Sequence, residues 1–180
     1  MRPAAFLDRD GVINLDHGYV VRWEDFEFVP GAIEAMRRLQ GAGYALVIVT
    51  NQSGIARGYY DEAAVQRLHE ALSAHLAQQG VTLAAIEYCP HLLDGSVARY
   101  AVSCDCRKPA PGMILRSAAA LDIDLARSLM FGDKPSDVEA GARAGVGRCM
   151  RLATNGSAQD DDSAVDFPNL LHAVNVLGIA

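Results

Sequence analysis

The sequence predicts an α/β fold built on a doubly wound, mostly parallel sheet. Short apolar runs alternate with longer segments whose apolar residues recur every three or four positions, which is typical of strands that alternate with helices. The chain has 180 residues, of which 51% are hydrophobic and 21% are charged. It is therefore long enough to bury a core but short for two domains. We expect a single domain over residues 1–180.

Five segments are expected to form strands. Residues 4–7 and 45–49 are continuous apolar runs of the kind found in parallel strands that are covered on both faces. Three further strands are predicted at residues 83–88, 129–131 and 146–152.

Helices are predicted between these strands and after the last one, at residues 30–41, 61–79, 111–121 and 136–144 and from residue 168 onward. In the longest, apolar residues recur at spacings of three and four, and Gly80 closes the helix. Ser136 is expected to cap the helix that it opens. His69 and His75, on the longest helix, are expected to be exposed to solvent. The region after Ala153 carries no motif.

Composition excludes several classes of partner. The formal net charge is −6, and the only basic doublets are Arg37–Arg38 and Arg107–Lys108. Binding to a nucleic-acid backbone needs a clustered basic face, so no nucleic-acid partner is expected. No apolar run approaches the roughly 18 residues of a membrane span, and the N-terminus does not read as a secretory signal. We expect a cytoplasmic monomer whose partner is a small molecule.

Polar or acidic residues follow three of the predicted strands. Asp8 and Asp10 follow the first, Thr50 and Asn51 follow the second, and Asp133 follows the fourth. Because the carboxyl ends of parallel strands share one edge of the sheet, where ligands bind in open α/β folds, these residues are expected to form one site. Buried carboxylates need a cation, and oxygen ligands suit Mg²⁺ shared with a substrate phosphate.

This set of side chains indicates phosphoryl transfer. An aspartate beside Mg²⁺ can act as a nucleophile, and a second acid two residues further on can protonate the leaving oxygen and then activate water. Lys108, Thr50 and Asn51 add a cation, a hydroxyl and an amide, which stabilise the charge of the transferring group. Taken singly, each aspartate also fits a helix cap or a turn. Three aspartates at strand ends favour the metal site.

Cys89, His91, Cys104 and Cys106 form a second group, in which two close pairs flank a loop. Three thiolates and one imidazole are a known tetrahedral set for Zn²⁺, and a site closed to substrate is structural. Outside an oxidising compartment, cysteines grouped in this way indicate metal binding before disulfides. The alternative is a chance group of buried cysteines and a surface histidine. Cys149 lies apart and is expected to pack in the core.

Four motifs together resemble those of the haloacid dehalogenase superfamily of phosphatases: FLDRDGVIN, VTNQSG, RKPAPGM and FGDKPSD, in that order over residues 6 to about 145. The resemblance implies that Asp8 is the nucleophile and Asp10 the general acid and base. It implies that Thr50 binds the phosphoryl group and that Lys108 neutralises it.

The same resemblance implies a Mg²⁺ ion held by Asp8, the backbone carbonyl of Asp10, and Asp133, with Asp137 supporting these ligands from the following helix. No large insertion separates the motifs, so no cap domain is expected. The loops at 15–28 and 89–108 must then supply specificity.

The zinc loop narrows the resemblance to two families, the D,D-heptose 1,7-bisphosphate phosphatases and the histidinol-phosphate phosphatases. DRDGVIN, VTNQSGIARGYY, GDK and the long loop between the zinc pairs favour the first family, which implies removal of the 7-phosphate from a heptose bisphosphate. Histidinol phosphate or another small sugar phosphate is the alternative substrate. A zinc-stabilised protein that binds a sugar phosphate without hydrolysing it is the alternative outside the enzymes. The implied substrate contacts are Asp16, His17, Gly18, Tyr19, Asn51, Gln52, Ser53, Arg107 and Lys134.

Overall fold

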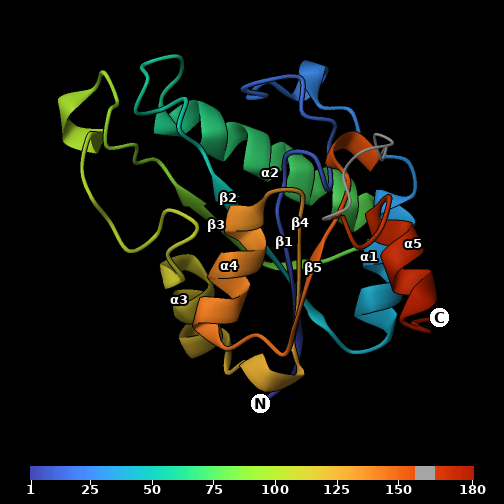
Figure 1. Cartoon of the computed structure of the whole chain (residues 1–180). Coiled ribbons are helices and arrows are strands. Elements are labelled where there is room, and N and C mark those ends of the chain that lie inside the picture. Colours follow the sequence, from blue (N-terminus) through green and yellow to red (C-terminus); the bar gives the residue numbers. More distant parts are fainter. Residues whose placement is uncertain (157–164) are drawn as a thin grey trace.

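The computed structural model describes residues 1–156 and 165–180 and contains one five-stranded sheet. The strands are β1 (Ala4–Leu7), β2 (Ala45–Asn51), β3 (Leu83–Cys89), β4 (Leu129–Gly132) and β5 (Arg148–Arg151). They lie in the order β3-β2-β1-β4-β5, and every neighbouring pair is parallel. The predicted doubly wound parallel sheet is confirmed, and its carboxyl edge lies at the top of Figure 1.

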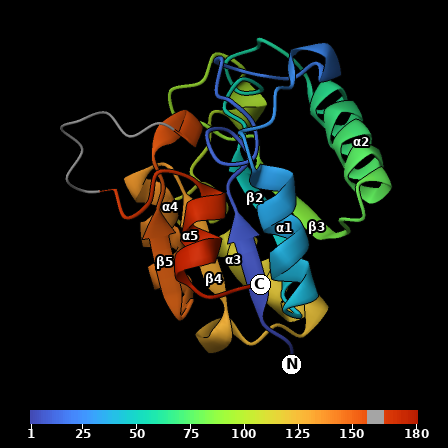
Figure 2. The ribbon, with the colours of Figure 1, turned by 90° about the vertical axis from the view of Figure 1, so that its right-hand side faces the viewer.

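Helices cover both faces of the sheet (Figures 1 and 2). One face packs against α1 (Ala32–Gly41), α2 (Glu62–Gln78) and α5 (Leu170–Val176), and the other against α3 (Gly112–Leu121) and α4 (Pro135–Ala144). The central strand β1 explains the two layers, because Ala5 and Leu7 point into the first core and Ala4 and Phe6 into the second. All four side chains are fully buried, as expected for a strand covered on both faces.

Two element boundaries differ from the predictions in ways that affect the site. Strand β2 continues to Asn51, which pairs with Cys89 of β3, so Thr50 belongs to the strand itself. The predicted cap of α4 at Ser136 is wrong: the helix begins at Pro135 with Lys134 as its N-cap. Proline suits the first helical position because its missing N–H would be unpaired there.

The prediction that His69 is exposed is also wrong. His69 is a residue of α2, and it is buried. The segment between β1 and α1 contains one short 3-10 helix, Trp23–Asp25, and the described residues include no cap domain. Within the described ranges, no helix combines the length and the apolar character that crossing a membrane requires.

Candidate active site

Lys108 lies buried between two carboxylates at the carboxyl edge of the sheet. Its Nζ atom is 2.9 Å from Asp8 Oδ1 and 2.7 Å from Asp137 Oδ1, and it donates to the Val49 carbonyl at 2.7 Å. The pKa of Lys108 is raised: burial opposes its charge, but the two aspartates outweigh that effect. Lys108 therefore brings a permanent positive charge to the end of β1.

Asp8 is the first residue after β1, and burial raises its pKa to about 7. Lys108 lowers this pKa, whereas the carboxylates of Asp137 and Asp133 raise it further. Close carboxylates disfavour one another's charged forms unless a cation lies between them. The three carboxylates therefore carry more negative charge than the single Lys108 ammonium can neutralise.

Two glycines let the carboxylates approach the strand ends. A Cβ atom on Gly11 would lie 2.4 Å from Asp133 Oδ2, and a Cβ atom on Gly132 would lie 2.1 Å from the Cβ of Asp137. Gly11 also has a φ of 88°, a left-handed conformation that glycine adopts at little cost. Side chains at these two positions would displace Asp133 and Asp137.

Asp8, Asp133 and Asp137 each place a carboxylate oxygen within 4.8 Å of the others. Asp133 Oδ1 is buried and has no hydrogen-bond partner among residues 1–156 and 165–180, which is costly for a carboxylate unless a cation binds it. Three acidic oxygens at this spacing suit Mg²⁺, which accepts oxygen ligands and keeps several waters. The residues therefore fit the metal. Asp137, expected only to support the ligands, offers an oxygen to the same centre as Asp8.

The side chain of Asp10 is not a member of this carboxylate group and lies in a network of donors. Arg9 Nη2 lies 3.0 Å from each of its oxygens, Asn14 Nδ2 donates to Oδ1 at 3.0 Å, and Gln52 Nε2 donates to Oδ2 at 3.0 Å. Burial opposes the charge of Asp10, but Arg9 and these donors hold its pKa below the usual value. The network stabilises the Asp10 carboxylate.

Arg9 supports this network from within the core, where its side chain is fully buried. Its guanidinium donates to the Val20 carbonyl at 2.7 Å and lies 3.1 Å from His69 Nε2. Burial and then Arg9 lower the pKa of His69 to about 3, so His69 is neutral and its Nε2 accepts the hydrogen bond. His69 is buried because a buried arginine needs acceptors.

Residues of β2 complete the floor of the site. Thr50 Oγ1 accepts a hydrogen bond from Gln52 Nε2 at 2.9 Å, which leaves its own proton available to a ligand. The Asn51 side chain makes two hydrogen bonds with the backbone of Lys108. Its Nδ2 donates to the Lys108 carbonyl at 3.1 Å, and its Oδ1 accepts the Lys108 N–H at 3.0 Å. The second strand thereby fixes the position of the lysine.

Two adjoining cavities open over these residues, and most of the predicted substrate contacts line them. The first, about 320 Å³, is lined by Asp8, Asp10, Thr50, Asn51, Ser53, Arg107, Lys108, Lys134, Ser136 and Asp137. The second, about 290 Å³, is lined by Asp10, Asp16, Gly18, Tyr19, Asn51, Gln52, Ser53, Tyr60 and Lys134. Because they share several residues, the two cavities form a single cleft that can hold a ligand larger than phosphate.

His17 is the predicted contact that does not line the cleft. Its Nε2 lies 3.2 Å from Glu27 Oε2, and its side chain is 52% exposed. The neighbouring Tyr19 does line the cleft and stacks edge-on against Tyr59, with ring centroids 4.8 Å apart.

The four predicted zinc ligands converge where β3 ends. Sγ of Cys106 lies 2.8 Å from that of Cys89, 3.3 Å from that of Cys104 and 3.3 Å from Nδ1 of His91. All four ligand atoms lie within 4.8 Å of one another. Three sulfurs and one imidazole nitrogen brought together in this way are a ligand set that suits Zn²⁺.

The zinc cluster is joined to the cleft by a short stretch of chain. Cys106 is followed directly by Arg107 and Lys108, and the Arg107 guanidinium donates to the His91 carbonyl at 3.0 Å. The cluster thus fixes both cationic residues at the edge of the cleft. Cys149 lies outside the cluster and packs against the core under α4.

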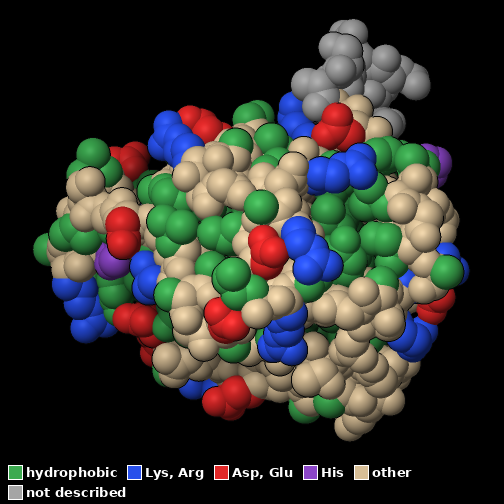
Figure 3. Space-filling view, turned by 90° about the horizontal axis from the view of Figure 1, so that it is seen from below, with side chains coloured by type: hydrophobic (Ala, Val, Ile, Leu, Met, Phe, Trp, Pro, Cys, Tyr) green, Lys and Arg blue, Asp and Glu red, His purple; other side chains and the backbone are tan. Residues whose placement is uncertain are grey.

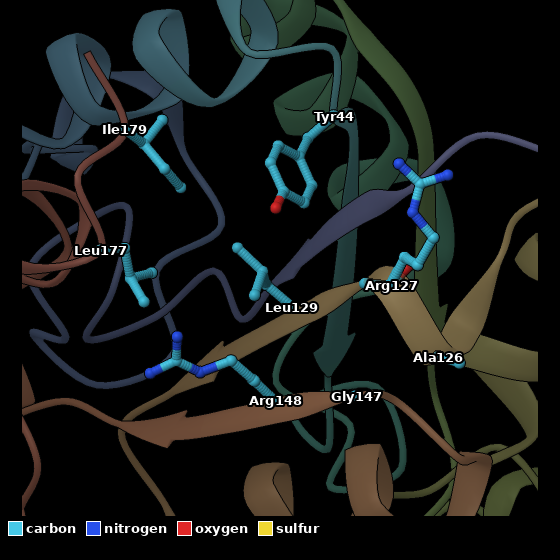
Figure 4. Close-up of a pocket in the computed structure, with 9 residues that line it drawn as sticks. Tyr44, Ala126, Arg127, Leu129, Gly147, Arg148, Leu177 and Ile179 are labelled. Carbon is cyan, nitrogen blue, oxygen red and sulfur yellow. The ribbon is translucent and has the colours of Figure 1, made fainter.

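A further cavity, about 350 Å³, lies at the opposite, amino edge of the sheet. Figure 4 shows Tyr44, Leu129, Leu177 and Ile179 turned toward this space, with Arg127 and Arg148 at its rim. Its lining includes no carboxylate, thiol or imidazole, and the Ser128 hydroxyl in it donates to the Asp124 carbonyl at 2.6 Å. The lower face of the molecule carries charges of both signs scattered among apolar side chains (Figure 3).

Several residues at the site were missed by the sequence analysis. Arg9 and His69 hold Asp10, and Tyr60 donates to Gln52 Oε1 at 3.0 Å while lining the cleft. Thr154, after β5, donates to Asp133 Oδ2 at 3.0 Å. The aromatic run at Tyr59–Tyr60 was a usable signal, whereas nothing in the sequence marked Thr154.

Comparison with known proteins agrees with this geometry. A family model for haloacid dehalogenase-like hydrolases matches residues 3–145. A curated D-glycero-beta-D-manno-heptose-1,7-bisphosphate 7-phosphatase from Photorhabdus laumondii is 54% identical over 152 residues, which are 84% of this chain and 81% of the relative. A relative of the same name from Yersinia pestis is 46% identical over 180 residues, which are 95% of this chain and 96% of the relative.

A solved structure is similar over almost the whole chain. The crystal structure of D,D-heptose 1,7-bisphosphate phosphatase from B. bronchiseptica, complexed with magnesium and phosphate, has a TM-score of 0.77 and 34% sequence identity to this chain and covers 97% of each.

Proposed function

The chain belongs to the haloacid dehalogenase-like hydrolase family, and we propose that it removes the 7-phosphate from D-glycero-D-manno-heptose 1,7-bisphosphate in a Mg²⁺-dependent reaction. One observation carries the proposal: Asp8 stands at the end of the central strand with Lys108 on one side and the carboxylates of Asp133 and Asp137 on the other. Such a site places an anionic nucleophile next to the charges that a phosphoryl group needs.

In the proposed first step, a carboxylate oxygen of Asp8 attacks phosphorus and the sugar oxygen leaves, which forms an aspartyl-phosphate. Bound Mg²⁺, held by Asp8 and Asp133 with the carbonyl of Asp10, would neutralise phosphoryl oxygens and favour the ionised form of Asp8. Lys108 and the Thr50 hydroxyl stabilise the same oxygens. Asp10 gives the leaving oxygen the proton that it took from water in the second step of the preceding turnover, and it returns to the carboxylate form that its donors favour.

In the second step, Asp10 takes a proton from water, which then attacks the phosphorus of the intermediate and releases Asp8. The donors from Arg9, Asn14 and Gln52 stabilise the carboxylate form of Asp10, which is the form that this step requires. Phosphate is the second product.

The cleft supports a substrate with more than one charged group. Arg107 and Lys134 line it in addition to Lys108, and the second cavity, beside Tyr19 and Tyr60, leaves room for the body of a sugar. A bisphosphate matches this distribution of cations better than a monophosphate does.

We propose the cytoplasm as the site of action, because the free thiols of the zinc cluster persist in a reducing compartment. The proposed enzyme acts as a monomer on a phosphorylated sugar and not on nucleic acid, since one chain supplies the whole cleft and its net charge is −6.

The test compares kcat/KM for the heptose bisphosphate with kcat/KM for histidinol phosphate, because discrimination between substrates is a ratio of these values. We expect phosphate release with Mg²⁺, none in excess chelator, and a ratio above about 100 in favour of the bisphosphate. A ratio below one would assign the enzyme to histidinol phosphate. Tight binding of the bisphosphate without phosphate release would make the chain a binding protein.

A further inference from the structure

The turn at residues 154–156, directly after β5, touches the carboxylate site although its sequence carries no motif. Thr154 Oγ1 donates a hydrogen bond to Asp133 Oδ2 at 3.0 Å. The next residue, Asn155, donates its backbone N–H to the Gly11 carbonyl at 3.2 Å, and its Oδ1 accepts the N–H of Asp16 at 2.5 Å. One turn thus contacts a metal-site carboxylate and the loop that follows β1.

The hydrogen bond from Thr154 makes the two oxygens of the Asp133 carboxylate different from each other. Oδ2 is bound by Thr154 and faces Gly11. Among the described residues, Oδ1 is buried and has no hydrogen-bond partner, and the Asp133 carboxylate offers an oxygen within 4.8 Å of carboxylate oxygens of Asp8 and Asp137. A hydroxyl that occupies one oxygen fixes the rotation of the carboxylate and directs the other oxygen toward the space that a cation would fill.

The backbone of the same residue is also held, because Arg151 Nε donates to the Asp133 carbonyl at 3.2 Å. Both Arg151 and Thr154 come from the end of β5, which pairs with β4 through Gly132 and Arg151. Asp133 is therefore positioned from the edge strand as well as from its own strand.

Asn155 holds the turn in place. It has a φ of 57°, a left-handed conformation that asparagine tolerates better than most residues. Its two hydrogen bonds join the turn to Gly11 and Asp16, and Asp16 Oδ1 in turn accepts the N–H of Gly18 at 3.0 Å. Asp16 and Gly18 line the cleft, so the turn connects the metal site with the wall that receives substrate.

We propose that Thr154 is a positioning residue for the magnesium site, acting through Asp133, and that Asn155 keeps the turn that carries it against the loop after β1. The proposal rests on the proposed function only in taking Mg²⁺ as the ion.

The test is a Mg²⁺ titration of the zinc-loaded full chain without substrate. Binding is measured by calorimetry and, independently, by the rise in Tm that Mg²⁺ causes. Thr154→Val keeps the shape of the side chain and removes the donor. We expect its Kd for Mg²⁺ to rise about tenfold or more, as when other groups that support metal ligands are lost. Thr154→Ser, which keeps the hydroxyl, is the matched control and is expected to stay within about twofold of the original chain.

Asn155→Gly provides a second variant, since glycine accepts the left-handed φ and only the side-chain hydrogen bond is lost. We expect its Kd for Mg²⁺ to rise about threefold, between the values of the two threonine variants. A purely structural role for Thr154 would lower the Tm of the metal-free valine variant and leave its Mg²⁺ affinity unchanged.

Equal Mg²⁺ affinity in Thr154→Val and Thr154→Ser would overturn the proposal, as would a chain that binds no Mg²⁺. Because the titration contains no substrate, its outcome is independent of which phosphate ester the enzyme hydrolyses. Failure to hydrolyse the heptose bisphosphate would refute the proposed function and leave this inference standing.

Discussion

The carboxylate site and the zinc cluster both gather metal-binding side chains, but they are built in different ways. Asp8, Asp133 and Asp137 come from distant parts of the chain and meet because β1 and β4 are neighbours in the sheet. The zinc ligands all lie within residues 89–106. The first site depends on the whole fold, whereas the second is largely specified by a local spacing.

The two sites also differ in what the metal would do. The carboxylate site lies at an open cleft and contains a buried lysine and, in the part of the chain that the structure describes, a carboxylate oxygen without a hydrogen-bond partner, so a metal there could share ligands with a substrate. The zinc cluster supplies four protein ligands, which complete a tetrahedral ion and leave no place for substrate. We therefore propose that the first site carries the chemistry and that the second fixes the segment that contains Lys108.

Among the variants that test this comparison between the two sites, Lys108→Met is expected to have the largest effect. The substitution leaves Asp8 and Asp137 without their cation, and breaking a buried ion pair costs about 3–5 kcal/mol of unfolding free energy. We expect kcat to fall at least about 10³-fold, because charge stabilisation of the phosphoryl group is also lost. Steady-state kinetics and urea unfolding in chelator provide the measurement.

The matched control for that change is Lys134→Met. Lys134 is 56% exposed and lies 3.7 Å from Asp16, so its loss should change the free energy of unfolding by no more than about 0.5 kcal/mol. If Lys108→Met kept a tenth of the original kcat, the buried lysine would not be part of the chemistry.

A smaller loss of activity is expected from Cys104→Ser, which weakens the zinc cluster. Lys108 would then be less well positioned, and we expect kcat to fall about 10- to 100-fold together with a lower zinc content and Tm. Added Mg²⁺ should not restore the Tm. Cys149→Ser is the matched control, because Cys149 lies outside the cluster. A Cys104→Ser protein with full zinc content and an unchanged Tm would show that the thiolate is not a ligand.

The sequence predicted both sites because each leaves a local signal. Apolar runs that end in polar residues marked the carboxyl edge, and two close pairs of ligands marked the zinc cluster. The parallel order of the strands then determined which strand ends meet. Asp137 was placed in the right region, although its contact with Lys108 depends on how α4 starts.

The contacts that were missed depend on long-range packing. Buried His69 accepts a hydrogen bond from the buried Arg9 guanidinium. Arg9 lies between two aspartates in the sequence, and nothing in that pattern indicates that its side chain points into the core. Thr154 meets Asp133 only because β5 pairs with β4. A threonine after the last strand has no local pattern that distinguishes it.

The pH dependence of unfolding tests the contact between His69 and Arg9, which in turn holds Asp10. Its folded pKa of about 3 lies below its unfolded value of 6.5, so the unfolded chain binds the proton more readily. Above about pH 6.5, His69 is neutral in both states and does not lower the free energy of unfolding. As the pH falls from 6.5 toward 3, protonation of the unfolded chain lowers that free energy by at most about 1.4 kcal/mol per pH unit.

His69→Gln keeps an acceptor for Arg9 but does not titrate. Both proteins carry the same zinc ligands, so the difference between their urea-unfolding curves from pH 7 to pH 4 isolates His69. We expect the variant to have the shallower pH dependence. Identical slopes would mean that the pKa of His69 is the same in the folded and the unfolded chain.

The smallest effect is expected from His17→Ala. His17 pairs with Glu27 at the surface and does not line the cleft, so kcat/KM should remain within about twofold of the original value. A tenfold rise in KM would show that the loop turns His17 toward the substrate when substrate binds.

The most direct measurement of the proposed chemistry is phosphate release by Asp8→Asn with saturating Mg²⁺ and heptose bisphosphate. Replacing one of three close carboxylates relieves repulsion, so the variant is expected to fold with an unchanged or higher Tm in chelator. Its kcat should fall at least about 10⁴-fold, because the amide cannot form the phosphoryl intermediate. A folded Asp8→Asn protein that still releases phosphate at more than about one hundredth of the original rate would contradict the assignment of Asp8 as the nucleophile.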